Sequence, residues 1–448
     1  MNNHAHRALR SRQRGWRLRL IAPLAVLGLV AAACGDSDDG DAQPAETTAP
    51  AETTVPADTG TDTTEPAEST ETTAAPGETE PAGDLTETLL TAFQAEVPQD
   101  ELDPLIVESL ELASQDLTDE QLDVAFDCWT NLRCDIPGGG DVVVGIADGF
   151  GDNTWRKFSL MEAIMQALTY PEIGEIIYTN AGGDLTAMQA NIRSLSAQGV
   201  DVMLTYNDFG PAVYPAYEAA QQEGAIVASY VSPSPDGEEA VDVTVTSDLC
   251  QVGREGTEAA AELAEPGSPI ALFTGTPGNP QGQAWFACAE DTAAEVDLDI
   301  AYRADTNWTP AGAFEAATAL IATGEEVDAI VYDYSTPLVQ VTEAYLQAET
   351  VPPDYVAWTM DNGLFCQWEE LQGGPNEFQL MFTHSLNWAA RTALTAAMNK
   401  LAGGEVPSVV TYPMPFVAAS EGLCQPDMPG DFPASALVPD TLISRMLG

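Results

Sequence analysis

Five apolar runs of this sequence end on side chains that can form hydrogen bonds. The runs are VVVGIAD, VDVMLTYND, AIVYDYS, VAWTMDN and LMFTH, and the residues at their ends include Tyr206, Asp208, Asp333, Asp361 and His384. Short apolar runs of this kind are typical of buried strands, and a polar group at the end of one is costly unless a partner satisfies its hydrogen bonds. In open α/β sheets, ligands bind beyond the carboxyl ends of the strands, so the pattern predicts a site for a polar molecule.

Two kinds of ligand fit these residue types. A tryptophan ring can cover the apolar C–H face of a sugar while carboxylate and amide groups bond its hydroxyls, which favours a carbohydrate. Asp208, Asp333 and Asp361 have no Arg or Lys in their own runs. They would therefore also suit a cationic ligand held by carboxylates and aromatic faces. We prefer the sugar.

An exported glycoside hydrolase that uses two of these acids is the enzymatic alternative. The sequence contains no nucleophile elbow or cofactor loop, and GTPGNPQG lacks the Lys and Ser/Thr of a phosphate loop. His384 is the only histidine after residue 33, which argues against a Ser-His-Asp triad and against a Cys/His zinc site. We expect a binding protein that is not an enzyme and that uses no metal or cofactor.

Strands and helices alternate from Asp141 onwards. DVVVGIAD, IGEIIYTN, VDVMLTYND and AIVASYVS have the composition of strands, and amphipathic segments such as LTAMQANIRSLSAQG separate them. Such βαβ repeats predict a parallel sheet with helices on both faces. The rhythm repeats after residue 231. We therefore expect an α/β fold of two doubly wound parallel-sheet lobes joined by a hinge, with residues 139–231 and 385–412 in lobe 1 and residues 232–384 and 413–448 in lobe 2.

The first 84 residues have a different character. Residues 1–33 combine a basic stretch with the apolar run LIAPLAVLGLVAAA, as in a signal peptide. The run stops at LVAAAC, which resembles the lipobox of bacterial lipoproteins and makes Cys34 the expected lipidation site. An ordinary signal peptide cleaved after Ala33 is the alternative. Residues 34–84, rich in Thr, Pro, Ala and acids, are expected to be a disordered tether.

Residues 85–135 are expected to form a small helical segment. LTETLLTAFQAEV, DPLIVESLELASQ and LTDEQLDVAFDCWTNL each repeat apolar residues at spacings of three and four. Thr118, followed three residues later by Gln121, has the pattern of a capping box at the start of the third helix.

The chain is strongly acidic. It carries 15 basic and 70 acidic residues, and removal of residues 1–33 takes away six arginines and no acid. Nucleic acid and anionic lipid surfaces are poor partners for such a field. We attribute the acidity to solvation in salty surroundings rather than to a ligand.

Seven cysteines are present, and six of them follow Cys34. An even number in an exported chain implies disulfides. Sequence proximity favours the pairs 128–134, 250–288 and 366–424, although sequence alone allows other pairings. The six residues are Cys128, Cys134, Cys250, Cys288, Cys366 and Cys424.

From about Asp141 to about Pro413 the chain resembles the type I periplasmic solute-binding proteins of the ribose- and galactose-binding branch. The resemblance rests mainly on NIRSLSAQGVDVMLTYNDFGPAVYPAYEAAQQEGAIVASY and on HSLNWAARTALTAAMNKLAGGEVP. It implies two hinged lobes that close on one small molecule. No helix-turn-helix precedes the lobes, which argues against the related repressors.

The resemblance also implies ligand-binding roles for individual residues. The loop DGFGDNTWRKF is similar to a family loop in which an Asn and aromatic residues grip a sugar. The position of a family Arg falls on Gln283, and this departure puts a ribose-like binding mode in doubt. The implied positions are Asn153, Trp155, Asp208, Gln283, Trp308, Asp333, Asp361 and His384, to which the strand end adds Tyr206. Trp155 and Trp308 could instead be core residues, Asp361 a helix cap, and His384 a satisfied hinge residue.

The expected function is that of a lipid-anchored extracytoplasmic solute-binding protein. It captures a small polar ligand, most simply a sugar, by hinge closure and delivers it to an ABC transporter. Its partners would then be the ligand, the permease subunits and the outer face of the cell membrane, which it reaches through the lipid on Cys34. A receptor for a cationic or other non-sugar solute, or a ligand-sensing subunit, is the alternative. The resemblance also favours a monomer.

Overall fold

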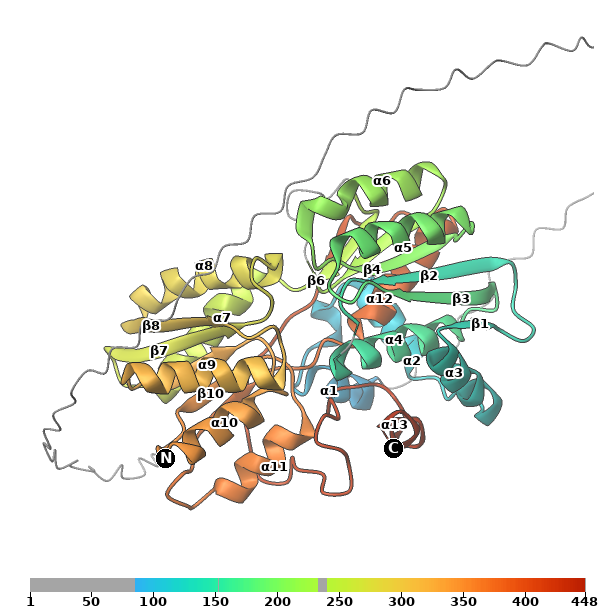
Figure 1. Ribbon diagram of the computed structural model, residues 1–448. Coiled ribbons are helices and arrows are strands. Elements are labelled where there is room, and N and C mark those ends of the chain that lie inside the picture. Colours follow the sequence, from blue (N-terminus) through green and yellow to red (C-terminus); the bar gives the residue numbers. More distant parts are fainter. Residues whose placement is uncertain (1–84, 152, 233–239, 448) are drawn as a thin grey trace, which may run out of the picture. The chain divides into compact units, whose positions relative to one another are not determined.

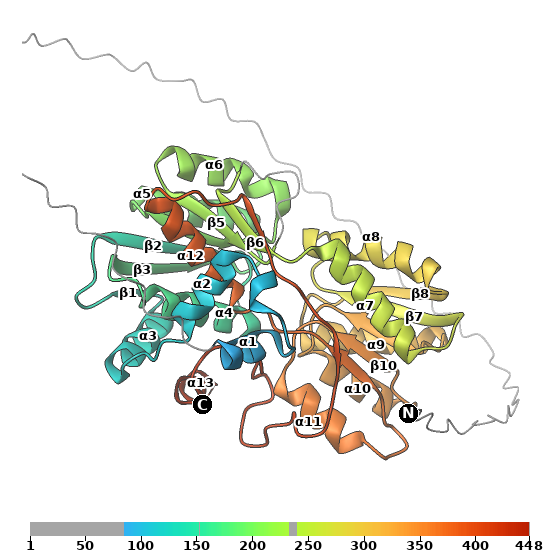
Figure 2. The same ribbon diagram turned by 180° about the vertical axis from the view of Figure 1, so that it is seen from behind.

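The structure is a computed structural model that describes residues 85–151, 153–232 and 240–447. The predicted signal peptide, Cys34 and the tether lie outside the described residues. Two separate sheets form the centres of two α/β lobes (Figures 1 and 2), so the predicted fold class is confirmed. Within the described residues, no helix is both long enough and apolar enough to cross a membrane.

The first sheet lies in lobe 1 and has the strand order β1-β3-β2-β4-β5-β6-β12. Its strands are β1 (Arg133–Asp135), β2 (Val142–Asp148), β3 (Ile173–Asn180), β4 (Val202–Tyr206), β5 (Ile226–Tyr230), β6 (Val243–Thr246) and β12 (Val409–Thr411). All pairs are parallel except that of β1 with β3. Helices α5 (Leu185–Ala197) and α6 (Tyr214–Gln222) cover one face, and α12 (Ala389–Leu401) covers the other.

The second sheet lies in lobe 2 and has the order β13-β11-β10-β9-β7-β8. Its strands are β7 (Ser268–Thr274), β8 (Leu298–Asp305), β9 (Ala329–Tyr332), β10 (Asp354–Ala357), β11 (Leu380–Phe382) and β13 (Val417–Ala418). Helices α7 (Leu249–Leu263) and α8 (Pro280–Glu295) pack together on one face, while α9 (Pro310–Thr323) and α10 (Leu338–Gln347) pack together on the other (Figure 1). Helix α11 (Asn362–Leu371) follows β10.

The chain passes between the sheets after β6, after β11 and after β12. The second and third crossings lie close to the predicted limits at 384 and 412. The first predicted limit, at 231, is wrong. Strand β6 pairs in parallel with β5, Ala228 opposite Val243, and also with β12. It therefore completes the first sheet before the chain crosses.

The helical segment before the first sheet has the predicted helices. They are α1 (Thr86–Phe93), α2 (Pro104–Ala113) and α3 (Asp119–Asn131), with a short 3₁₀ turn at Gln99–Glu101. The capping box at Thr118 is present with both of its hydrogen bonds. The segment ends differently from the prediction, because residues 133–135 form β1 rather than helix.

Helix α4 (Thr154–Ala167) is more deeply buried than an amphipathic surface helix. Every residue from Phe158 to Ala167 is buried, because α2, α3 and α12 all pack against it. The first turn of α4 follows β2 directly, so it lies at the carboxyl edge of the first sheet. A 3₁₀ turn at Gly210–Val213 has the corresponding place after β4.

Two further expectations concern the cysteines and the C-terminus. The three predicted disulfides, 128–134, 250–288 and 366–424, are confirmed. The assignment of residues 413–448 to lobe 2 is correct for β13, which pairs with β11. It is wrong for α13 (Asp440–Leu447), which packs on α3 beside lobe 1.

The packing of α7 against α8 gives a testable prediction. A Cβ added to Gly253 would lie 2.4 Å from the carbonyl oxygen of Trp285 in α8. We expect Gly253→Ala to lower the free energy of unfolding by about 1–2 kcal/mol, because overpacking outweighs the better helix propensity of alanine.

Gly256 in the same helix is the matched control. Its added Cβ would meet no atom closer than 3.4 Å, so Gly256→Ala should raise the free energy of unfolding by up to about 1 kcal/mol. Denaturant titration of both variants measures the effect. Equal changes of the same sign would contradict this account of the helix crossing.

Candidate functional site

A cavity lies between the two lobes, at the carboxyl ends of their strands. Its volume is about 30 Å³, whereas ordinary small-molecule pockets begin at about 300 Å³. Protein side chains fill most of the space between the lobes. The lining residues are Asn153, Trp155, Arg156, Tyr206, Val231, Gln281, Trp308, Asp333, Tyr334, Thr359 and Leu386.

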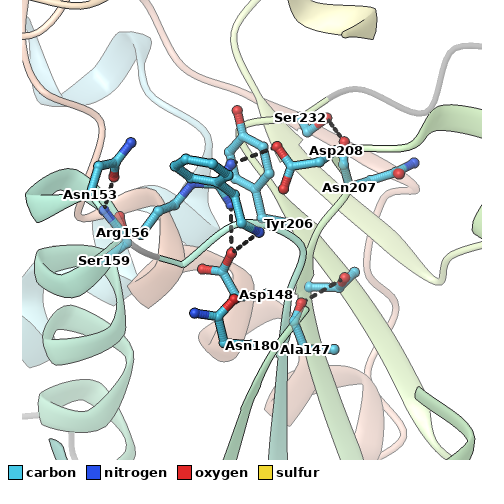
Figure 3. A network of polar contacts seen from close by, with 12 residues as sticks. Ala147, Asp148, Asn153, Arg156, Ser159, Asn180, Tyr206, Asn207, Asp208 and Ser232 are labelled. Carbon is cyan, nitrogen blue, oxygen red and sulfur yellow. Dashed lines mark hydrogen bonds and ion pairs between the residues drawn. The ribbon is translucent and has the colours of Figure 1, made fainter. Parts of the chain in front are cut away.

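A buried arginine holds the lobe 1 side of this cleft together (Figure 3). Arg156 donates from Nη1 to Asp148 Oδ1 at 2.9 Å and from Nη2 to Asp208 Oδ1 at 2.8 Å. Its side chain is only 2% exposed. The two acids end neighbouring strands, β2 and β4, and Arg156 is in the first turn of α4, so three elements meet at one guanidinium. A buried charge needs such partners.

The environment of Asp208 differs from the prediction. The sequence suggested that it had no cation nearby, but Arg156 pairs with it. Burial raises the pKa of Asp208 to about 6, although the charge of Arg156 acts in the opposite direction. Asp208 does not cap the following turn, because the side chain that accepts from Phe209 N is that of Asn207.

Each of the two carboxylates has one oxygen without a hydrogen-bond partner in the described part of the chain. Asp148 Oδ2 and Asp208 Oδ2 are buried and accept no hydrogen bond from the residues that the structure describes. A buried acceptor without a partner is costly. Neither residue lines the cavity, and both oxygens stay available as acceptors.

Aromatic rings surround the guanidinium. The Arg156 Cζ atom lies 3.3 Å from the ring centroid of Tyr206, a cation–π contact. The Tyr206 hydroxyl donates to Gln281 Oε1 of lobe 2 at 2.8 Å, which joins the lobes across the cleft. Trp155 packs edge-on against Tyr206 and donates from Nε1 to Ser385 O at 2.5 Å.

Asp333 organises the lobe 2 side. Its Oδ2 accepts from Thr274 Oγ1 at 2.6 Å and from Trp285 Nε1 at 3.1 Å, and its Oδ1 accepts from Trp308 Nε1 at 2.8 Å. Burial raises the pKa of Asp333 to about 6, while these hydrogen bonds lower it. Because three donors occupy its oxygens, Asp333 orients Trp308 in the cleft wall.

Four predicted site residues do not line the cavity: Asp208, Gln283, Asp361 and His384. Asp361 accepts from Ser335 Oγ and Thr336 Oγ1 and makes no cap bond to α11. Burial raises the pKa of Asp361 to about 7, against the effect of these two hydroxyls. His384 is fully buried among the rings of Phe93, Trp388 and Tyr412. Its Nε2 lies 2.9 Å from Pro413 O, while its Nδ1 has no partner among the described residues.

One residue of α8 lines the cavity, but it is not the predicted one. Gln283 is exposed on α8, and Gln281, two residues earlier, lines the cavity instead. The sequence analysis also missed Arg156 and Asp148. Asp148 ends one of the five apolar runs, and Arg156 directly follows Trp155. Both residues therefore lie next to sequence features that predicted the site. Tyr334 and Thr359 also lie in two of the five apolar runs, whereas Leu386 gave no comparable signal.

The arrangement provides aromatic faces and hydrogen-bond acceptors. Within the described ranges, no group of three or more His, Cys, Asp or Glu side chains is placed to hold a metal ion. Such a site can bind a molecule that combines apolar faces with hydroxyl groups.

Comparisons with known proteins agree with this fold. Residues 144–362 match the family model described as periplasmic binding protein domain. One structure with the same fold is an ABC transporter solute-binding protein from Bacillus halodurans C-125 with bound myo-inositol, at 16% identity and a TM-score of 0.55, covering 62% of this chain and 95% of that chain. No curated protein sequence matches the chain significantly.

Two further structures are similar at the same level. A periplasmic solute-binding protein from Actinobacillus succinogenes 130z with bound D-allose has 18% identity and a TM-score of 0.53, over 62% of this chain and 97% of that chain. The binding component of the arabinose ABC transporter from Shewanella sp. ANA-3 has 15% identity and a TM-score of 0.56, over 62% and 92%. Identities this low establish the fold alone.

The Arg156 network gives a prediction for stability. We expect Arg156→Met to lower the free energy of unfolding by about 3–5 kcal/mol, because it leaves two buried carboxylates without their cation. Arg193→Met, at an exposed position on α5, is the control and should change it by less than about 0.5 kcal/mol. Equal losses in a denaturant titration would show that the carboxylates do not depend on Arg156.

His384 gives a prediction for pH dependence. Burial lowers its pKa from 6.5 to about 4, although its hydrogen bond with Pro413 O acts in the opposite direction. A depressed pKa in the folded state means that the unfolded chain binds the proton first. The stabilising contribution of neutral His384 is therefore complete above about pH 6.5 and is lost as the pH falls towards 4.

His384→Gln removes this titration. The stability advantage of the wild type over the variant should shrink by about 3 kcal/mol between about pH 7.5 and about pH 4. Denaturant titrations of both proteins at the two pH values measure it. An advantage that does not change with pH would mean that His384 titrates normally.

Proposed function

Residues 144–362 of this chain belong to the periplasmic binding protein domain family, and from this premise we propose that the protein is an extracytoplasmic solute-binding protein for a neutral sugar or cyclic polyol. The ligand is held in the cleft between the lobes and delivered to an ABC transporter. Lipid on Cys34, outside the described residues, anchors the protein to the outer face of the cell membrane.

The pairing of Arg156 with Asp148 and Asp208 carries the choice of ligand. A cationic ligand would have to compete with Arg156, which already pairs with both carboxylates at 2.9 and 2.8 Å and leaves the three groups with one net negative charge instead of two. Asp333 has three donors of its own. The acids of the cleft are therefore better suited to accept hydrogen bonds from hydroxyl groups than to neutralise a cation.

The aromatic side chains support the same ligand class. Trp155 and Trp308 are each less than a tenth exposed and line the cavity from opposite lobes. Rings on two sides can cover the apolar C–H faces of a sugar or cyclitol while the carboxylates bond its edge. The similar proteins from Bacillus and Actinobacillus contain myo-inositol and D-allose, which are molecules of this kind.

Entry of such a ligand requires the lobes to separate. The cavity of about 30 Å³ is too small for a monosaccharide, and Tyr206 and Gln281 join the lobes across it. Three crossings link the sheets, so a rotation about them would open the cleft. Hinge closure then brings both walls onto the ligand.

The binding test uses a panel of neutral and cationic molecules. We expect calorimetric titration to find saturable binding of a neutral monosaccharide or cyclitol, with myo-inositol, D-allose and L-arabinose as the first probes. Choline and spermidine should not bind. Binding of a cation in place of every neutral probe would refute the assignment.

Asp208→Asn tests the carboxylate directly. The variant keeps the shape of the side chain but removes the charge that strengthens hydrogen bonds to the ligand. Affinity for the neutral probe that binds should fall at least about tenfold, which corresponds to 1.4 kcal/mol. Asp299→Asn, at an exposed position on β8, should leave affinity unchanged. Unchanged affinity in both variants would remove Asp208 from the site.

A further inference from the structure

The segment after β13 is tied firmly to lobe 2. Cys424 forms a disulfide with Cys366 of α11. The side-chain amide of Asn362 donates to three carbonyl groups of the segment, those of Gln425, Met428 and Pro429. One covalent bond and several hydrogen bonds therefore fix this end of the segment.

The next residues of the segment continue along lobe 2. Gly363 N donates to Gly430 O at 2.6 Å, and Asn362 N donates to Phe432 O at 2.9 Å. A Cβ on Gly363 would lie 2.8 Å from Gly430 O, so only glycine allows the two backbones to approach this closely. The position of residues 430–432 is thus set by lobe 2.

The same residues also contact helix α4 of lobe 1. Thr154 Oγ1 donates to Asp431 Oδ2 at 2.7 Å, and the rings of Phe158 and Phe432 are 6.4 Å apart. Further along, Leu437 N donates to Glu162 Oε1 at 2.6 Å. Helix α4 begins with the cleft residues that follow Asn153, so the segment is attached to the helix that carries the cleft wall.

A second connection runs through the crossing between β11 and α12. Ser385 N donates to Ser435 Oγ at 2.7 Å, and Ser385 O accepts from Trp155 Nε1. Ser435 is fully buried. Ser385 therefore connects the indole of Trp155 to Ser435 of the C-terminal segment.

We propose that residues 425–438 form a latch that holds the cleft closed and positions its Trp155 wall. Their attachment to lobe 2 includes a disulfide, whereas their attachment to α4 is entirely non-covalent. When the lobes separate, the contacts with α4 break first, and both the Thr154–Asp431 pair and the Leu437–Glu162 hydrogen bond must part. The latch follows the matched family segment, which ends at residue 362, and it acts whichever molecule the cleft binds.

Hydrogen exchange of the full chain without added ligand tests the latch. The variants are Thr154→Val, Asp431→Ala and the double variant, with Thr318→Val as control because Thr318 is exposed and bonds only to its own helix. Each single variant should speed exchange about tenfold in peptides at both cleft edges, residues 206–210 and 333–337. The double variant should be no faster than the singles, since one interaction is lost in all three.

Two results would overturn the proposal. One is unchanged exchange at both cleft edges in the single variants. The other is a double variant whose effect is the product of the two single effects, because the residues would then act independently. Exchange in the centres of β4 and β9 shows whether a variant has lost its fold instead.

Removal of the anchor gives an independent test if a point variant does not fold. Replacing Cys366 and Cys424 by Ser should speed exchange at both cleft edges. The matched control replaces Cys128 and Cys134, whose disulfide joins α3 to β1 beside lobe 1, and should act only locally. Equal exchange at the cleft edges in the two proteins would refute the latch, whether or not a sugar binds.

Discussion

The buried Arg156 guanidinium is the interaction on which the cleft depends. It joins the ends of β2 and β4 to the first turn of α4 and lies against the face of Tyr206. Without this cation, two carboxylates would be buried next to each other in a region of low dielectric constant, which is strongly unfavourable. With it, each carboxylate directs one oxygen to the guanidinium, and its second oxygen has no partner among the described residues. The charge balance of the site therefore sets both its stability and the class of molecule that it suits.

The opposite wall is organised by a different principle. The carboxylate oxygens of Asp333 accept hydrogen bonds from one hydroxyl and two indole groups. Its role is therefore to orient aromatic rings rather than to bind a ligand directly. The two lobes thus contribute unequally. Lobe 1 supplies acceptors, and lobe 2 supplies oriented aromatic surface. The cleft is complete only when both walls meet, which makes the connections between the lobes part of the binding site.

Much of the fold could be predicted from the sequence because its signals are local. Alternating apolar runs and amphipathic segments identified the strands and helices, and the capping box at Thr118 was recognisable from two residues. The place of β6 was not predictable in this way, because its sheet is decided by pairing with β5 and β12. The site residues also divide into those with a local sequence signal and those whose role depends on distant residues. Asp208 and Trp155 stand at strand and loop ends, whereas the role of Arg156 also depends on Asp208, which is 52 residues away in the sequence.

The identity of the small molecule that the cleft retains is the most direct test of the Arg156 network. The measurement is mass spectrometry of the small molecules released by denaturing the purified wild-type protein after exposure to an equimolar mixture of neutral sugars, cyclitols, choline and spermidine. The account predicts one neutral, hydroxyl-rich molecule in a one-to-one ratio to protein, with neither cation retained. Release of choline or spermidine in that ratio would contradict the account, because it would mean that the Arg156 network leaves free negative charge in the cleft.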